Sequence, residues 1–202
     1  PGDNPSANLV SPTSAKKLQP LELDLVQTLN RRHLASRSHD TALAARIKSF
    51  ETAFQMQQAA PEAFDLSQEP EHIRKLYGLD RKLKGVGSDF AWQCLVARRL
   101  AERGVRFIEL IDSGSRPNWD SHSDMKEHAD LAYNVDQPTA ALITDLKQRG
   151  MLEDTIVLWA TEFGRTPSRE GKNGRGHHRD CFSIWLAGGG FKPGHVHGGT
   201  YE

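Results

Sequence analysis

Acidic and histidine side chains recur in the second half of the chain at positions that suit a metal ion. They flank three apolar runs: Asp120, His122, Asp124 and His128 after the first, Glu162 and Arg165 after the second, and His177 and His178 before the third. Carboxylate oxygens and imidazole nitrogens converging from separate loops suit Zn²⁺, Mn²⁺ or a related divalent ion. The pattern predicts a metal site, whereas any one residue taken singly also fits a solvated loop charge or a locally hydrogen-bonded histidine.

The stretch LWATEFGRTP, residues 158–167, changes from apolar side chains to opposite charges three positions apart. A surface ion pair worth at most about 1 kcal/mol is the simplest alternative. An arginine beside a metal, however, offers a planar fork to a tetrahedral oxyanion. The favoured interpretation therefore makes Glu162 a metal ligand and Arg165 an anion contact.

The apolar runs themselves read as strands. Residues 105–111, 155–161 and 182–189 lack polar alternation, and helices are expected before the first two of them, the second helix being capped by Asp136. Apolar strands separated by helices indicate an α/β fold whose mostly parallel sheet is flanked by helices on both faces. In such sheets ligands bind beyond the carboxyl ends of the strands, where the charged residues lie.

The first part of the chain has a helical pattern of apolar residues instead of strand-like runs. Apolar residues between positions 21 and 56 recur near the helical period and predict two helices, and a further short helix is expected over residues 71–77. We expect a mainly helical segment over 1–87 that packs on an α/β core portion over 88–202. Loop-like residues at the start and a strand-like ending predict one incomplete domain, the carboxy-terminal part of a longer protein.

Composition limits the classes of partner. The 202 residues carry 26 basic and 26 acidic side chains, so a net charge of zero argues against nucleic acid or an anionic membrane surface as partner. No apolar run approaches the roughly 20 residues of a membrane-spanning helix. The two cysteines, Cys94 and Cys181, build no disulfide framework. Composition leaves the oligomeric state open.

Four stretches carry a family resemblance: WDSH, EFGRTP, GRGHH and FSIWLAGGGFKPG. They resemble an uncharacterised bacterial, planctomycete-type family of sulfatase-like proteins related to the alkaline phosphatase superfamily. The resemblance implies an alkaline-phosphatase-like fold, a periplasmic or exported location and a divalent metal, Zn, Mn, Ca or Mg. By matching motifs it implies Asp120, His122, Glu162 and His177 as ligands and Arg165 as the catalytic contact to the substrate anion.

One position departs from that family. Gly176 stands in GRGH where the family usually has Asp, and the missing carboxylate would weaken the support of a neighbouring ligand or the site itself.

The leading functional hypothesis is that the full-length protein, of which this chain is the carboxy-terminal part, is a metal-dependent hydrolase of sulfate or phosphate esters that acts on a small molecule or a polysaccharide. The alternative is a non-catalytic module that binds a sulfated or phosphorylated polysaccharide, and a third possibility is that the charged loops only stabilise a structural domain. The nucleophile is not identified. Ser113, Ser115 and Thr161 lie near the predicted site, but hydroxyls at loop starts more often cap or turn the backbone.

Overall fold

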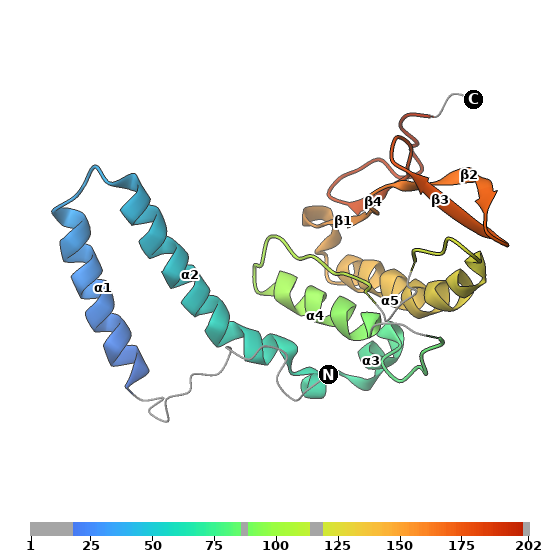
Figure 1. Cartoon of the computed structure of the whole chain (residues 1–202). Helices are drawn as coiled ribbons and strands as arrows, with labels where there is room; N and C mark the ends of the chain where they lie inside the picture. The colour runs from blue at the N-terminus through green and yellow to red at the C-terminus, as the bar shows by residue number, and fades with distance from the viewer. Residues whose placement is uncertain (1–17, 86–88, 114–118, 200–202) are drawn as a thin grey trace. The chain divides into compact units, whose positions relative to one another are not determined.

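The structure, a computed structural model, describes residues 18–85, 89–113 and 119–199 (Figure 1). Ser115, one of the hydroxyl candidates, lies outside the described residues. The chain divides into two compact units, Pro1–Ser67 and Gln68–Glu202, which are described separately below.

In the described part of the first unit, residues 18–67, there are two helices, α1 (Gln19–Ala35) and α2 (Thr41–Phe64), where the apolar spacing predicts two. Asp40 begins α2, because its side chain accepts a hydrogen bond from the backbone N–H of Leu43 at 2.8 Å and so satisfies one of the free amides of the first turn. A 3₁₀ turn, Leu66–Gln68, follows α2.

The second unit is built on three helices that pack on one another, α3 (Glu71–Tyr77), α4 (Phe90–Glu102) and α5 (His128–Gln148) (Figure 1). Asp89 caps α4 by accepting from the backbone N–H of Trp92 at 3.1 Å. The core lies between these helices, and its largest fully buried side chains are Tyr77, Cys94, Leu95, Pro138, Asp145 and Leu146. Shorter 3₁₀ segments, Met125–Glu127 and Leu152–Asp154, precede and follow α5.

Helix α5 begins earlier than the sequence predicts. The sequence predicts that Asp136 caps the helix, yet the helix starts at His128 and runs through Asp136 and Pro138. Leu131 and Val135 extend the apolar stripe toward the N-terminus at a spacing of four, and both are buried against the core. Burial of this stripe outweighs the cost of a proline inside the helix.

A network of charges is buried among these helices. The Arg98 side chain, 2% exposed, donates from Nη2 to Glu69 Oε2 and from Nη1 to Glu102 Oε2, each at 2.7 Å. Its Nε lies 3.0 Å from Asp145 Oδ2, an ion-pair distance at an angle that makes no hydrogen bond. We call this set the helix charge cluster; its members are Glu69, Tyr77, Arg98, Arg99, Glu102, Asp145 and Arg149.

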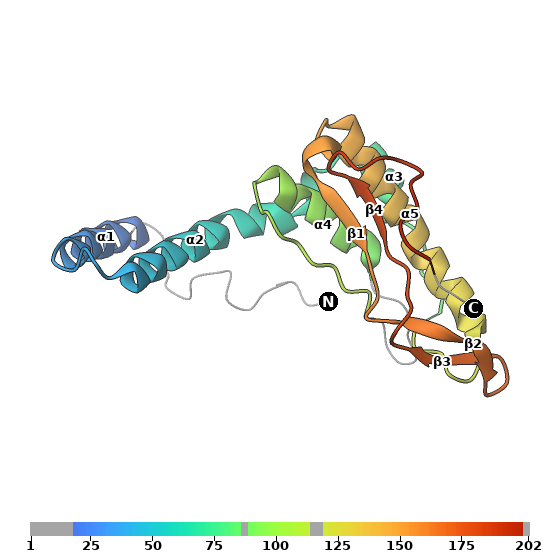
Figure 2. The ribbon, with the colours of Figure 1, turned by 90° about the horizontal axis from the view of Figure 1, so that it is seen from above.

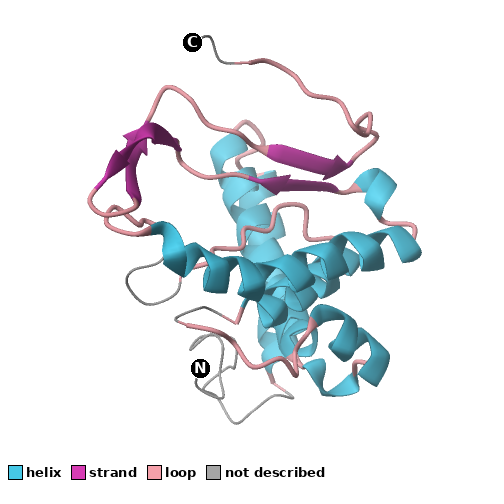
Figure 3. Ribbon diagram, turned by 90° about the vertical axis from the view of Figure 1, so that its right-hand side faces the viewer, coloured by secondary structure: helices cyan, strands magenta, loops and turns pink. Residues whose placement is uncertain are grey.

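The strands form two separate antiparallel pairs (Figure 3). Strand β1 (Ile156–Trp159) pairs with β4 (Trp185–Gly188), with Leu158 opposite Leu186, and the two lie side by side in Figure 2. Strand β2 (Gly164–Glu170) pairs with β3 (Gly174–His178). Both pairs lie on one side of helices α3 to α5 (Figures 1 and 3).

The expected α/β fold with a mostly parallel sheet is wrong, and with it the alkaline-phosphatase-like architecture. The described residues form only these two-stranded antiparallel sheets. The expectation rested on apolar strands being covered on both faces, but Ile156 and Leu158 are each 56% exposed. Residues 105–111, expected as the first strand, belong to neither pair, and Phe107 within them is 83% exposed.

Among the described helices, none combines the length and the apolar composition needed to span a lipid bilayer, as the sequence predicts.

Candidate metal centre

Trp119 anchors the loop that carries the first two predicted ligands. Its indole Nε1 donates to Asp112 Oδ2 at 2.7 Å. Its carbonyl oxygen accepts from the backbone N–H of Ser121 and from His128 Nε2, both at 3.0 Å. The loop is therefore tied to the preceding extended segment and to the start of α5.

The loop then runs along the edge of β3. The backbone amides of Asn173 and Arg175 donate to carbonyls within residues 121–125, at 2.8 and 3.3 Å. Gly174 permits this approach, because a Cβ built there would lie 1.8 Å from the carbonyl oxygen of His122. Any other residue at 174 would push the loop away from the strand.

Three ligand atoms from this loop and from β3 converge on one point. Asp120 Oδ1 lies 2.8 Å from His177 Nε2 and 3.1 Å from His122 Nε2, and the two imidazole Nε2 atoms are 3.1 Å apart. The three side chains are 39% to 61% exposed, so the cluster faces solvent. Together, Asp120, His122 and His177 are the group we call the metal triad.

Neighbouring side chains hold the two imidazoles. Glu170 Oε2 lies 3.2 Å from Nδ1 of His122. The ring of His177 contacts the rings of His122 and Phe163, with centroids 4.6 and 4.5 Å away. One histidine is thus oriented by a carboxylate and the other by ring packing.

Asp120 is an anionic member of the triad. The hydrogen bond from His177, followed by that from the Arg165 guanidinium, lowers the pKa of its carboxyl to about 2. The carboxylate therefore stays ionised throughout the neutral range and is available as a charged ligand.

The arrangement fits a metal ion. Ligand atoms at the corners of a tetrahedron, each about 2.0 to 2.1 Å from zinc, are about 3.3 Å apart, close to the separations in the triad. If Nδ1–H of His122 donates to Glu170, the Nε2 lone pair of His122 faces the carboxylate of Asp120 and the Nε2 of His177. A metal ion between these atoms would replace the proton that His177 Nε2 donates to Asp120 in the metal-free protein, because imidazoles coordinate metals through a deprotonated nitrogen.

The structure places the other predicted residues elsewhere. The group of converging ligand atoms found among the described residues does not include Glu162, which is exposed after β1. Asp124 accepts from the backbone N–H of Lys126 and caps a 3₁₀ turn. His178 follows His177 in β3, so its side chain points to the opposite face. The hydroxyl of Thr161 donates to the carbonyl of Phe163 at 2.6 Å, as expected of a turn residue.

Arg165 lies beside the triad but is already engaged. Its Nη2 donates to Asp120 Oδ1 at 2.7 Å and to the Trp119 carbonyl at 3.3 Å, and its Nη1 donates to the Arg175 carbonyl at 3.3 Å. These contacts hold Asp120 in place and connect the loop to the β2–β3 hairpin. The arginine thus supports a ligand, in addition to any contact it makes with an anion.

Sequence reasoning missed Glu170 and Phe163. The pairing of β2 with β3 slips between Arg165 and Arg169, around Pro167, which has no N–H to donate to the ladder. Residue spacing therefore does not predict which way a side chain points beyond such an irregularity. The only hint for Phe163 was its position between the two charges of EFGRTP.

The model of one protein family, described as "Protein of unknown function (DUF1501)", matches residues 2–202. No curated protein and no solved structure matches the chain. The resemblance to sulfatase-like proteins of the alkaline phosphatase superfamily is therefore wrong, because neither a sulfatase nor an alkaline phosphatase family matches.

Proposed function

The chain belongs to the DUF1501 family, and we propose that it binds one divalent metal ion through the metal triad and hydrolyses phosphate or sulfate esters there. The observation that carries this proposal is the convergence of Asp120 Oδ1 and the two imidazole Nε2 atoms within 3.1 Å of one another. Three protein ligands leave a coordination position open for substrate or water, the feature that separates catalytic from structural zinc sites.

The types of ligand atom narrow the choice of metal ion. Two imidazoles and one carboxylate suit zinc or manganese, whereas calcium and magnesium prefer sites built of oxygen atoms. Of the four metals the sequence suggests, we therefore expect Zn²⁺ or Mn²⁺. When bound, such an ion supplies Lewis acidity toward an ester oxygen and activates the nucleophile.

The surroundings favour an anionic substrate. His177 also lines a surface pocket of about 300 Å³ together with His178, Arg179 and Asp180. The guanidinium of Arg179 is largely exposed, with Asp180 3.6 Å away, so it can reach a negatively charged group in this pocket. Arg165 holds Asp120 and adds positive charge behind the triad.

A hydrolysis assay on the chain itself tests the proposal. We expect zinc- or manganese-dependent release of p-nitrophenol from p-nitrophenyl phosphate or sulfate. His122→Ala should abolish it, and His195→Ala, which changes an exposed histidine outside the triad, should leave it intact. Turnover that persists after chelation, or that His122→Ala does not reduce, contradicts the proposal.

A non-catalytic binding module is the second candidate. Its support is that the hydroxyl of Thr161, one of the candidate nucleophiles, donates to the carbonyl of Phe163 within its own turn. Metal-dependent binding of a sulfated polysaccharide without turnover of any ester would favour this module over the hydrolase.

A further inference from the structure

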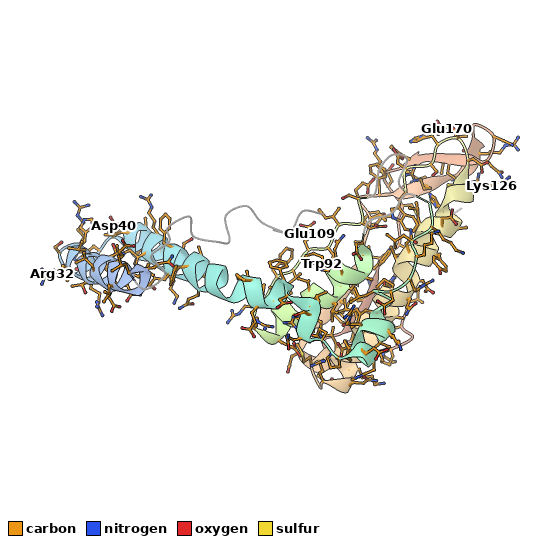
Figure 4. All side chains as sticks on the ribbon, turned by 90° about the horizontal axis from the view of Figure 1, so that it is seen from below. Arg32, Asp40, Trp92, Glu109, Lys126 and Glu170 are labelled. Carbon is orange, nitrogen blue, oxygen red and sulfur yellow. The ribbon has the colours of Figure 1, made fainter. Side chains whose placement is uncertain are left out.

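Glu170 is the acidic side chain nearest the non-coordinating nitrogen of a triad histidine. It stands at the end of β2, on the hairpin seen at the upper right of Figure 4, and its Oε2 is 3.2 Å from His122 Nδ1. Nothing in the spacing of the sequence assigns it a role. The side chain is 52% exposed, so burial does not explain its position.

Gly176 leaves the space that this carboxylate occupies. A Cβ built on Gly176 would lie 2.7 Å from Glu170 Oε2, closer than real Cβ contacts allow. The neighbouring Thr166 atoms would be 3.5 and 3.6 Å away, an ordinary contact distance. A methyl group at 176 would therefore displace the flexible end of Glu170 and little else.

From these two observations we infer that Glu170 is a positioning residue for the metal site. Its carboxylate accepts the Nδ1–H of His122, fixes the ring and leaves the Nε2 lone pair directed at the point where the triad converges. Carboxylates that accept from a ligating imidazole raise its basicity and fix its tautomer. The role rests on the metal binding proposed above.

With Glu170 in this role, Gly176 has the opposite effect to the weakening of the site that the sequence analysis expects. An aspartate there would bring its own carboxylate into the space that Glu170 uses. The glycine does not remove the carboxylate support of the site; it admits that support from the neighbouring strand.

Zinc affinity of the variants is the first test, measured by competition with a chromophoric chelator. Glu170→Ala should weaken Zn²⁺ binding by about 10- to 100-fold, the usual cost of losing such a partner. Glu170→Gln keeps an acceptor oxygen and should lose less. Glu153→Ala removes an exposed carboxylate elsewhere in the same unit and should bind zinc as the parent does.

Gly176→Ala tests the same contact from the other side. It should weaken zinc binding as Glu170→Ala does, and the double variant should be no weaker than either single one, because both remove one interaction. Long-range ¹H–¹⁵N NMR of the metal-free protein adds a readout that a merely structural role would not change. His122 should carry its proton on Nδ1 in the parent and shift toward Nε2–H in both variants.

The outcomes separate this role from the function it rests on. If the parent binds no zinc, the proposed metal site fails and the role of Glu170 fails with it. If the parent binds zinc and the Glu170 and Gly176 variants bind it equally well with an unchanged tautomer, the metal site stands and only the positioning role is overturned.

Discussion

The helix charge cluster and the metal triad use similar residue types in opposite settings. In the first, Arg98, Glu69 and Asp145 are 2% to 5% exposed, and each carboxylate meets at least one cationic donor. In the second, the triad is 39% to 61% exposed, and atoms of like character, two imidazole Nε2 atoms, lie 3.1 Å apart beside a carboxylate. In the first set every carboxylate is matched by buried cations, whereas in the second Arg165 is the cation that meets Asp120 and the two imidazole Nε2 atoms remain open to solvent.

In both the helix charge cluster and the metal triad, hydrogen bonds lower the pKa of a carboxyl group, but the surroundings of the two groups differ. Burial by itself would raise the pKa of Glu69, and hydrogen bonds from Arg98 and Arg99 reverse that effect and lower it. Hydrogen bonds from His177 and Arg165 lower the pKa of Asp120 in a largely solvated position. A depressed pKa alone therefore does not distinguish a functional group from a structural one; the difference is in burial and in which atoms converge.

The largest expected effect is on stability, in the helix charge cluster. Arg98→Met should lower the free energy of unfolding by about 3 to 5 kcal/mol, because it leaves Glu69, Glu102 and Asp145 without their shared cation. Urea unfolding followed by circular dichroism measures it. Arg106→Met, at an exposed position, is the matched control, and a loss below about 1 kcal/mol for Arg98→Met would contradict a structural role.

The metal triad should stabilise the fold chiefly when its ion is present. At a free Zn²⁺ concentration 100 times the Kd, the parent should gain about 2.7 kcal/mol, since the metal binds the folded state. His177→Ala should gain nothing under the same conditions. Thermal unfolding with and without zinc checks this, and an equal gain in both proteins would place the metal elsewhere.

A smaller effect is expected for Tyr77, whose buried hydroxyl donates to Asp145 Oδ2 at 3.1 Å. Tyr77→Phe should cost about 1.5 kcal/mol, at the low end for a hydrogen bond to a charged group, because Arg149 still partners Asp145. Zinc affinity should not change. If Tyr77→Phe lost zinc affinity but not stability, the helix charge cluster and the metal triad would not be independent, and the prediction would be wrong.

The smallest effect belongs to Asp120 in the metal-free protein. Its folded-state pKa of about 2 lies below the unfolded value of about 3.9, so its contribution to stability is present at neutral pH and is lost as the pH falls through about 2. Asp120→Asn should therefore cost less than about 1 kcal/mol at pH 7, and the difference between parent and variant should shrink as the pH falls from about 4 to about 2. Denaturant unfolding across this pH range measures the difference in unfolding free energy between parent and variant. A difference that grows as the pH falls would refute the prediction.

Local patterns in the sequence predict the helices better than the sheets. The helices expected over residues 21–56 and 71–77 are present, and Asp40 caps α2 through its own first turn, because these features depend on neighbours within one or two turns. Strand partners lie far along the chain. The apolar run around Leu158 could not show that its partner is antiparallel β4 or that one face stays exposed.

In the candidate site, too, the residues that the sequence predicts differ from those that depend on contacts between distant parts of the chain. Asp120 and His122 share one short loop, and His177 faces them from β3. Residue chemistry pointed to these three only among eight candidates, and the motif match selected them together with Glu162. Glu162 was included because it directly follows a predicted buried strand, but the chain bends after β1 and leaves Glu162 exposed. Glu170 was missed because its approach to His122 depends on an irregular hairpin and on the absence of a side chain at Gly176.

X-ray absorption at the zinc edge tests the central claim most directly. With one equivalent of Zn²⁺, the parent should show two imidazole nitrogens and at least one oxygen at about 2.0 to 2.1 Å. His122→Ala should lose this signature, and Arg98→Met, under conditions where it remains folded, should keep it. A parent that binds no zinc, or a spectrum that is unchanged in His122→Ala, would contradict the assignment of Asp120, His122 and His177 as a metal centre.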